Sequence, residues 1–322
     1  MRRRGSRLGL CLVTLLTLAT PAAAQEVAHS VLFTFADRAV TESSGLVDAG
    51  DVVHTVNDSG SDAELFSVDA RTGETALVTT YAEEVEDVEA LAPAPDGDVW
   101  VADVGDNVER RDEVWVHRVT PGSSSPAPRF GLRYPGGPRD AETLLAHPRT
   151  GRLFVVSKTV FGGVVYAAPR RLVPGEVHRL RPFARVPGLL TDGAFFPDGE
   201  HVLVRGYATA TVLTFPGFET VGSFPLPRQQ QGEGLSIGPG GRVLVSSEGV
   251  NEDVLEVQLP REVVAALEAG PDAAPTEPPS AVPRPAPERL GASDAPWGWW
   301  AAGALGVGLA AVALLLLGQR RR

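Results

Sequence analysis

The chain has 322 residues, of which 43% are hydrophobic and 21% are charged, and its formal net charge is −11. This length allows one large domain or two small ones. The acidic charge argues against a nucleic acid or an anionic lipid surface as partner, and it favours cations or cation-bridged anions.

Residues 1–24 have the layout of a secretory signal peptide, with a basic start, an apolar stretch and small residues at Ala22 and Ala24. We expect cleavage before Gln25. The single cysteine, Cys11, lies inside this segment, so the mature chain would contain no disulfide, thiolate metal site or cysteine nucleophile. Without the four arginines of this segment and the three at the C-terminus, the remaining chain carries −18.

Five segments then share one pattern of an acidic or polar patch, a short apolar run, a glycine-containing turn and a β-rich run that ends in polar residues. The flanks of the turns alternate apolar and polar residues, as strands do, and glycine in the turns supplies the positive φ of a tight hairpin. Further strand candidates follow each copy. The five copies are residues 42–60, 87–107, 140–159, 192–208 and 232–249.

The copies are spaced by about 40–53 residues, near the length of a four-stranded propeller blade. The sequence therefore predicts an all-β fold, a β-propeller over residues 25–268, with five blades, or six if one blade has diverged. Residues 29–35 would supply the fourth strand of the last blade and close the ring. The alternative is an antiparallel sandwich. A helical period is present at the end of this region, over residues 260–270.

The C-terminal region predicts a membrane anchor. Residues 269–296 are rich in proline and alanine and suggest an extended stalk, and residues 297–317 are uncharged and long enough to span a bilayer. The basic residues 318–322 mark the cytoplasmic side. We expect an exported, single-pass protein, monomeric, with its N-terminal domain outside and its own helix in the bilayer.

The propeller topology predicts where the polar ends of the repeats meet. The first strand of each blade lines the central channel and the second runs antiparallel beside it, so the start of the first and the end of the second lie on one face. Carboxylates gathered there repel one another unless a cation neutralises them, and Ca²⁺ accepts such oxygen ligands in flexible numbers. We predict a calcium site with Asp103, Asp106, Glu89 and Glu142 as the best candidates, joined by Glu42, Asp58, Asp87, Asp140, Glu233 and Glu248.

The same face would receive Asp192 and two cations, Lys158 and Arg205. These cations could neutralise some acids, or stabilise a developing anion if the protein is an enzyme. The structural alternative is that the acids accept hydrogen bonds from backbone amides and lock blade to blade. "GLSIG" at 234–238 matches a serine-nucleophile motif, but a hairpin follows it where that motif needs a helix. The six histidines form no local pair with zinc spacing.

The run from "ESSGL" through "NDSG", "DVEAL", "PDGDVWVADVGDN" and "RDAETLL" to "GEGLSI" resembles secreted bacterial β-propellers of the TolB-like, SMP-30-like and phytase-like kind, over about residues 40–250. The resemblance implies a propeller fold. Enzymes of these groups use calcium or another divalent ion in a carboxylate-lined mouth to act on phosphate esters or lactones, so the resemblance also implies such a site. A phytate pocket would need more basic residues than this mouth offers.

Three functional hypotheses follow. The first is a non-catalytic, membrane-tethered module that binds an extracellular protein, a glycan or a small ligand at its acidic, calcium-containing mouth. The second is a calcium-dependent hydrolase of phosphate esters, carboxylic esters or lactones, in which the acids hold the metal and Lys158 or Arg205 stabilises the anion. The third is an envelope scaffold that spaces its partners.

Overall fold

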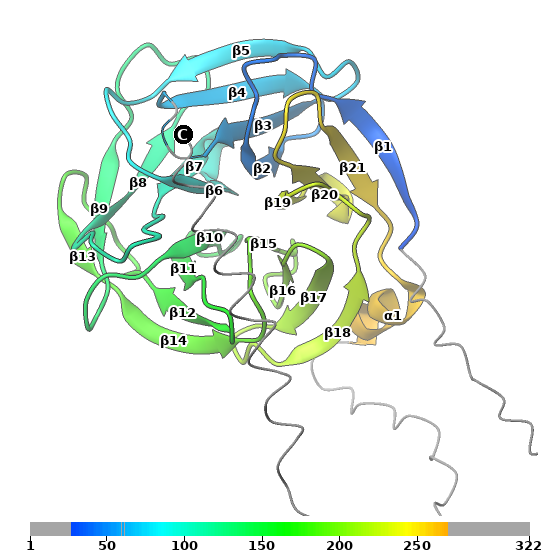
Figure 1. Cartoon of the computed structure of the whole chain (residues 1–322). Coiled ribbons are helices and arrows are strands. Elements are labelled where there is room, and N and C mark those ends of the chain that lie inside the picture. The colour runs from blue at the N-terminus through cyan, green and yellow to red at the C-terminus, as the bar shows by residue number, and fades with distance from the viewer. Residues whose placement is uncertain (1–26, 59, 61, 270–322) are drawn as a thin grey trace, which may run out of the picture. The chain divides into compact units, whose positions relative to one another are not determined.

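The computed structural model describes residues 27–58, 60 and 62–269, and these form a ring of five sheets around a central axis (Figure 1). The predicted five-bladed β-propeller is confirmed, and the antiparallel sandwich and the six-bladed ring are excluded. The predicted signal peptide, stalk, membrane helix and basic tail fall on residues 1–26 and 270–322, outside the described residues.

Each blade is one sheet whose strands follow the chain outward from the axis, except that the last blade takes its outer strand from the N-terminus. The strands of blade 1 are β2 (Ser43–Asp48), β3 (Val52–Asn57), β4 (Glu64–Asp69) and β5 (Thr75–Thr80); of blade 2, β6 (Val88–Pro93), β7 (Val99–Asp103), β8 (Val114–Val119) and β9 (Arg129–Arg133); of blade 3, β10 (Ala141–Ala146), β11 (Leu153–Ser157), β12 (Gly163–Ala167) and β14 (Arg181–Val186); of blade 4, β15 (Asp192–Phe195), β16 (His201–Arg205), β17 (Thr209–Thr214) and β18 (Thr220–Pro225); and of blade 5, β19 (Gly232–Ile237), β20 (Val243–Ser247), β21 (Asp253–Val257) and β1 (His29–Thr34).

The strand register confirms that the start of each first strand and the end of each second strand lie on one face. In every blade these two ends are paired residue against residue. The five pairs are Ser43 with Asn57, Val88 with Asp103, Ala141 with Ser157, Asp192 with Arg205, and Gly232 with Ser247. We call this face the mouth.

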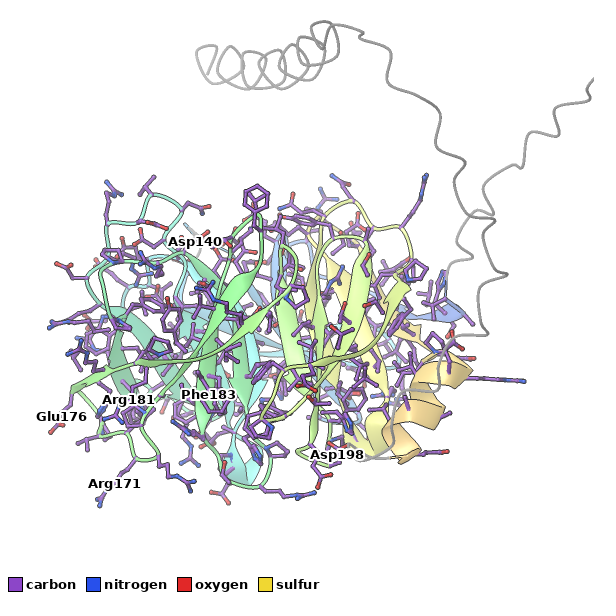
Figure 2. The ribbon with its side chains drawn as sticks, turned by 90° about the horizontal axis from the view of Figure 1, so that it is seen from below. Asp140, Arg171, Glu176, Arg181, Phe183 and Asp198 are labelled. Atoms are coloured by element: carbon purple, nitrogen blue, oxygen red, sulfur yellow. The ribbon has the colours of Figure 1, made fainter. Side chains whose placement is uncertain are left out.

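Short turns occupy the opposite face, where the first strand of each blade passes into the second. Gly151 and Gly199 adopt positive φ there (63° and 66°), as the turn pattern predicts. Figure 2 shows the ring from the side, with Asp140 near the mouth and Asp198, in a turn of blade 4, near the opposite face.

The N-terminal strand closes the ring, as predicted for residues 29–35. β1 pairs antiparallel with β21, and Phe33 and Phe35 are buried against blades 5 and 1. One strand was not predicted: β13 (Val177–Arg179) lies in the connection within blade 3 but adds to β9 of blade 2 in parallel. It covers the edge that blade 2 would otherwise expose.

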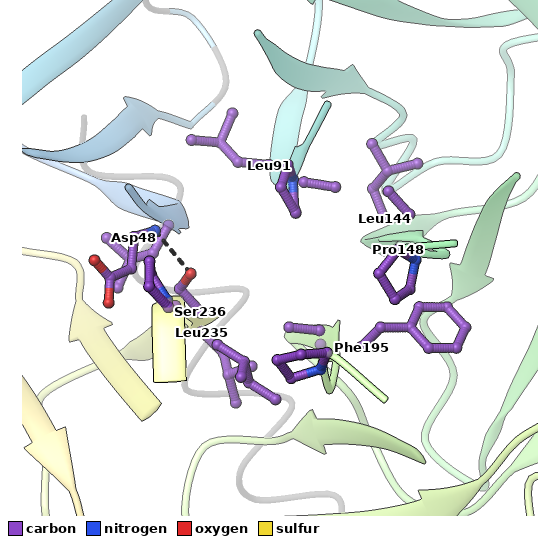
Figure 3. A pocket seen from close by; sticks show the side chains of 17 residues that line it. Asp48, Leu91, Leu144, Pro148, Phe195, Leu235 and Ser236 are labelled. Atoms are coloured by element: carbon purple, nitrogen blue, oxygen red, sulfur yellow. Dashed lines mark hydrogen bonds between the residues drawn. The ribbon is translucent and has the colours of Figure 1, made fainter. Parts of the chain in front are cut away.

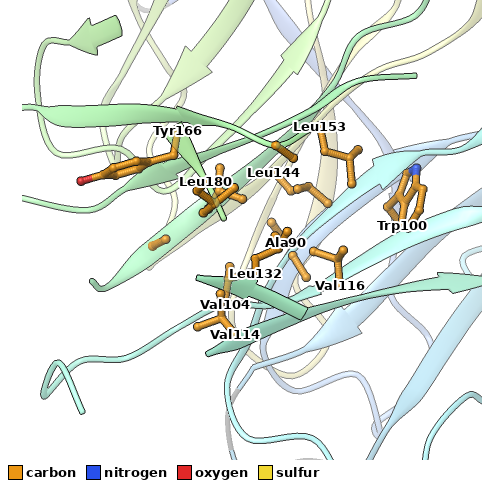
Figure 4. Packing of buried hydrophobic residues seen from close by; sticks show 14 of the residues in the cluster. Ala90, Trp100, Val104, Val114, Val116, Leu132, Leu144, Leu153, Tyr166 and Leu180 are labelled. Atoms are coloured by element: carbon orange, nitrogen blue, oxygen red, sulfur yellow. The ribbon is translucent and has the colours of Figure 1, made fainter. Parts of the chain in front are cut away.

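The hydrophobic core is divided among the blade interfaces. Five buried clusters are present in the described residues, one at each junction of neighbouring sheets. Figure 4 shows the junction of blades 2 and 3, where Trp100, Leu132 and Val116 of blade 2 pack with Leu144 and Leu153 of blade 3, among others. The inner strands of each sheet are almost entirely buried, as β2 and β10 show, whereas outer strands such as β1 and β5 are largely exposed.

The described residues contain one α-helix, α1 (Arg261–Ala269), where the helical period predicts it. It packs on β18 through the buried side chain of Val263. Among the described residues no helix has both the length and the apolar character needed to cross a membrane.

Candidate functional site

Bulges aim three glutamates into the mouth. In blades 2 and 3 the pairing of the first two strands skips one residue just below the mouth pair, and the skipped residues are Glu89 and Glu142. In blade 5 the shift falls between Gly232 and Leu235, where Glu233 holds the equivalent position. A bulge breaks the in-out alternation of the strand and re-aims a side chain. The three glutamates are therefore buried at one level of the ring, at 4–7% exposure.

Blades 1 and 2 bring three carboxylates together. One oxygen from each of Asp58, Asp87 and Glu89 lies within 4.8 Å of the other two. Two oxygens on one Ca²⁺ at about 2.4 Å are at most about 4.8 Å apart, so this spacing suits a single ion. Asp87 is 9% exposed, and its Oδ1 has no hydrogen-bond partner within the described residues.

The electrostatics of this trio show an unbalanced negative site. Burial, then the charges of Asp58 and Asp87, raise the pKa of Glu89 to about 10. Burial, then Asp58 and Asp140, raise the pKa of Asp87 to about 6. A buried oxygen without a donor and two carboxyls that resist ionisation are the features that a bound cation would relieve.

Gly105 makes room for the trio. A Cβ at this position would lie 2.5 Å from Cγ of Asp87 and 2.6 Å from Oε1 of Glu89, so no other residue fits without displacing both carboxyls. Its backbone N–H also donates to the carbonyl of Asp87 (3.0 Å). The glycine therefore lets the backbone close over two ligand candidates.

The other half of the mouth, from blades 3, 4 and 5, holds a mixed polar group. Lys158 forms an ion pair with Glu142, and its Nζ lies 6.0 Å from the centre of the Tyr207 ring. Tyr207 forms a hydrogen bond with Glu233, and burial followed by this acid raises the pKa of the tyrosine to about 12. Tyr207 therefore stays protonated as a donor at neutral pH.

Among the mouth residues with a shifted pKa, Glu248 has the pKa that lies nearest to neutral pH. It is half-buried, at the end of blade 5's second strand. Burial, then the charges of Glu233, Asp58 and Glu42, raise its pKa to about 7. Glu42 lies beside it, joined by a single antiparallel bridge between the first and last blades.

Asp103 and Asp106, the first-ranked ligand candidates from the sequence, have their oxygens bound within the chain. Asp103 forms an ion pair with Arg111 (2.7 Å) and accepts the N–H of Asp87 (3.0 Å). Asp106 accepts the N–H groups of Arg110 and Arg111 (2.8 and 2.7 Å). These contacts hold the loop after β7 in place around both carboxylates. Among the predicted ligands in the described residues, the grouping of oxygens within 4.8 Å of one another comprises Asp58, Asp87 and Glu89.

Arg205 also has a structural position. It is fully buried and donates to the carbonyls of Gly234 and Ser246 (3.0 and 3.2 Å), across the junction of blades 4 and 5. Asp192 beside it accepts the N–H of Leu235 (2.7 Å). At the level where blades 2, 3 and 5 contribute glutamates, blade 4 therefore contributes buried side chains that hold it to blade 5. Because its guanidinium is used in these contacts, Arg205 is not available to a ligand.

Leucines separate the mouth from the opposite face. Two residues beyond the bulge position, Leu46, Leu91, Leu144 and Leu235 converge at 0–2% exposure. The same leucines line a largely apolar pocket of about 280 Å³ near the axis (Figure 3). Ser236 of the "GLSIG" motif lies there, where its Oγ accepts the N–H of Asp48 (2.9 Å). It lies on a strand, so it is no nucleophile elbow.

Sequence reasoning missed Tyr207, Gly105 and Arg111. Tyr207 follows Arg205 by two residues, and counting into the loop beyond each second strand would have found it. Gly105 and Arg111 gave no such signal, because their roles depend on how the loop after β7 folds back on Asp87 and Asp103.

No protein-family model matches the sequence, and none of the curated proteins matches it as a relative. Among solved structures, a gluconolactonase from Xanthomonas campestris is 16% identical, with a TM-score of 0.47, and the match covers 74% of this chain and 88% of that one. The PQQ-bound aldose sugar dehydrogenase from Streptomyces coelicolor is 14% identical, with a TM-score of 0.40, and the match covers 73% and 99%. Similarities this distant carry no activity over to this chain.

Proposed function

We propose that the protein binds a divalent cation at the mouth and there hydrolyses a carboxylic ester or lactone. The type of ligands available favours Ca²⁺ as the cation. The observation that carries the proposal is the group of Asp58, Asp87 and buried Glu89, whose oxygens lie within 4.8 Å of one another, together with an Asp87 oxygen that has no hydrogen-bond partner in the described residues. Oxygen-only ligands favour a hard cation over zinc. When bound, the cation would polarise the carbonyl of the substrate.

The chain's own residues supply the remaining roles. Glu248, with a pKa of about 7, suits a general base that takes a proton from water near neutral pH. Lys158, with a side chain 19% exposed beside Glu142, offers positive charge where an oxyanion would form. The leucines below, at 0–2% exposure, give the far side of the site an apolar lining.

The same geometry favours carboxylic esters and lactones over phosphate esters. A phosphate group carries its own negative charge and needs cationic donors. Of the two cations predicted at the mouth, Arg205 is fully buried on backbone carbonyls, so Lys158 alone is left to meet a substrate, and its charge is already shared with Glu142. A neutral substrate suits this acidic opening better.

The test is calcium-dependent turnover of p-nitrophenyl butyrate and δ-valerolactone by the purified protein. Glu248→Gln should lower kcat by about 10²- to 10⁴-fold and remove the loss of activity below pH 7. Glu109→Gln, on an exposed mouth loop, is the matched control. Calcium binding without turnover of either ester class would replace hydrolysis with the non-catalytic binding module.

A further inference from the structure

Apolar side chains surround the acidic mouth. Among the large hydrophobic residues that the described part of the chain exposes, five lie on loops that join the second and third strands of blades 2 to 5. These loops follow the strand ends that define the mouth, so they stand at its edge. We call this set the apolar rim: Val108 (62% exposed), Val160 (72%), Phe161 (99%), Tyr207 (41%) and Val250 (42%).

The rim is closest to the site at blades 3 and 4. Phe161 and Val160 belong to the same short turn as Lys158, which the hydroxyl of Thr159 closes on the carbonyl of Gly162. Tyr207 presents its ring to Lys158 at 6.0 Å and its hydroxyl to Glu233. Apolar surface and titratable groups are therefore adjacent on these two loops.

An apolar rim around an acidic centre disfavours partners with a flat surface, such as a protein face or a bilayer. A protein surface or a bilayer that covered the rim would also bury the carboxylates in the middle without compensating charge, which is costly. Anionic lipids would in addition be repelled. A small ligand with a polar end and an apolar body satisfies both zones, because the polar end reaches the acids while the body covers the rim.

We propose that the ester or lactone taken by this mouth carries an apolar chain or ring that lies on Val160, Phe161 and Tyr207. The inference rests on the proposed function and narrows its substrate class.

Binding of product-like alkanoates tests this without turnover. Calcium-loaded protein is titrated calorimetrically with butanoate, hexanoate, octanoate and decanoate. Full burial of a methylene lowers Kd roughly fourfold. A chain that lies on the rim buries about half of its surface, so we expect Kd to fall about twofold per added methylene. Phe161→Ser and Val160→Ser should flatten this dependence, and Val264→Ser, an exposed valine on α1, should leave it unchanged.

The outcomes separate the two proposals. Chain-length dependence that requires Phe161 supports the rim even if no ester is hydrolysed. Equal affinity for all alkanoates, with calcium-dependent turnover of short esters intact, overturns the rim and leaves the proposed function standing. Sedimentation with phosphatidylcholine vesicles that Phe161→Ser abolishes would also overturn it, in favour of a membrane contact.

Discussion

Equivalent positions in the ring have different chemistry because their neighbours differ. Glu89 faces Asp58 and Asp87, whereas Glu142 has Lys158 and Glu233 has Tyr207. Their position at the start of each first strand predicts that these glutamates reach the mouth. It does not predict which one is left beside other acids, because that depends on the loops of neighbouring blades.

Two buried histidines predict how the fold responds to acid. Burial lowers the pKa of His54 and of His117 to about 4. Because the folded pKa lies below the unfolded value of about 6.5, their neutral forms contribute stability that is lost as the pH falls from 6.5 toward 4. At pH 5 each should cost about 2 kcal/mol.

His117→Phe should remove about half of this cost, since phenylalanine keeps the edge contact with Tyr81 and has no Nδ1 to protonate. The measurement is the free energy of unfolding by urea at pH 7 and pH 5. His29→Phe, at an exposed site, is the control. An unchanged difference between the two pH values in His117→Phe would contradict the assignment.

At the scale of elements, strand order was predictable and loop structure was not. Alternating flanks and recurring glycine turns predicted the five repeats, and the N-terminal strand that closes the ring followed from counting strands. The partners of Asp103 and Asp106 could not be predicted at this scale. Their position after β7 suits a ligand, but Arg111, eight residues after Asp103, returns to bind Asp103 while its backbone N–H binds Asp106. The addition of β13 to β9 likewise left no periodic signal, because β13 has three residues.

Ring closure by β1 should be essential for folding. Phe33 and Phe35 are buried at 5% and 1%, and truncating one buried phenylalanine costs about 3–5 kcal/mol, so losing both approaches the whole stability of a domain. A chain that begins at Asp37 should fail to give a folded monomer, whereas one that begins at Gln25 should fold.

Size-exclusion chromatography and circular dichroism measure this outcome, and a synthetic peptide of residues 27–36 added in trans should restore some folded protein. A stable monomer that melts within a few degrees of the longer chain would show that β1 is dispensable.

At the scale of the whole molecule, five blades bring residues from 42 to 248 to one opening, and the leucines below close it. Protons and a cation compete for this opening. In the cation-free protein the pKa of Glu89 is raised from 4.5 to about 10 and that of Asp87 from 3.8 to about 6. Stability is therefore lost as the pH rises from these unfolded values to the folded values, because the unfolded chain releases the two protons that the folded chain retains. A bound cation should restore that stability, and its affinity should increase with pH because its ligands must lose protons.

The most direct measurement is calorimetric titration of Ca²⁺ into the purified protein at pH 6 and pH 8. We predict one site, tighter at pH 8, weakened at least about tenfold by Glu89→Gln and by Gly105→Ala. The controls Glu84→Gln, at an exposed acid, and Gly217→Ala, where a Cβ meets ordinary contacts, should bind as the wild type does. No binding, or equal binding by wild type and Glu89→Gln, would contradict a cation site at the mouth.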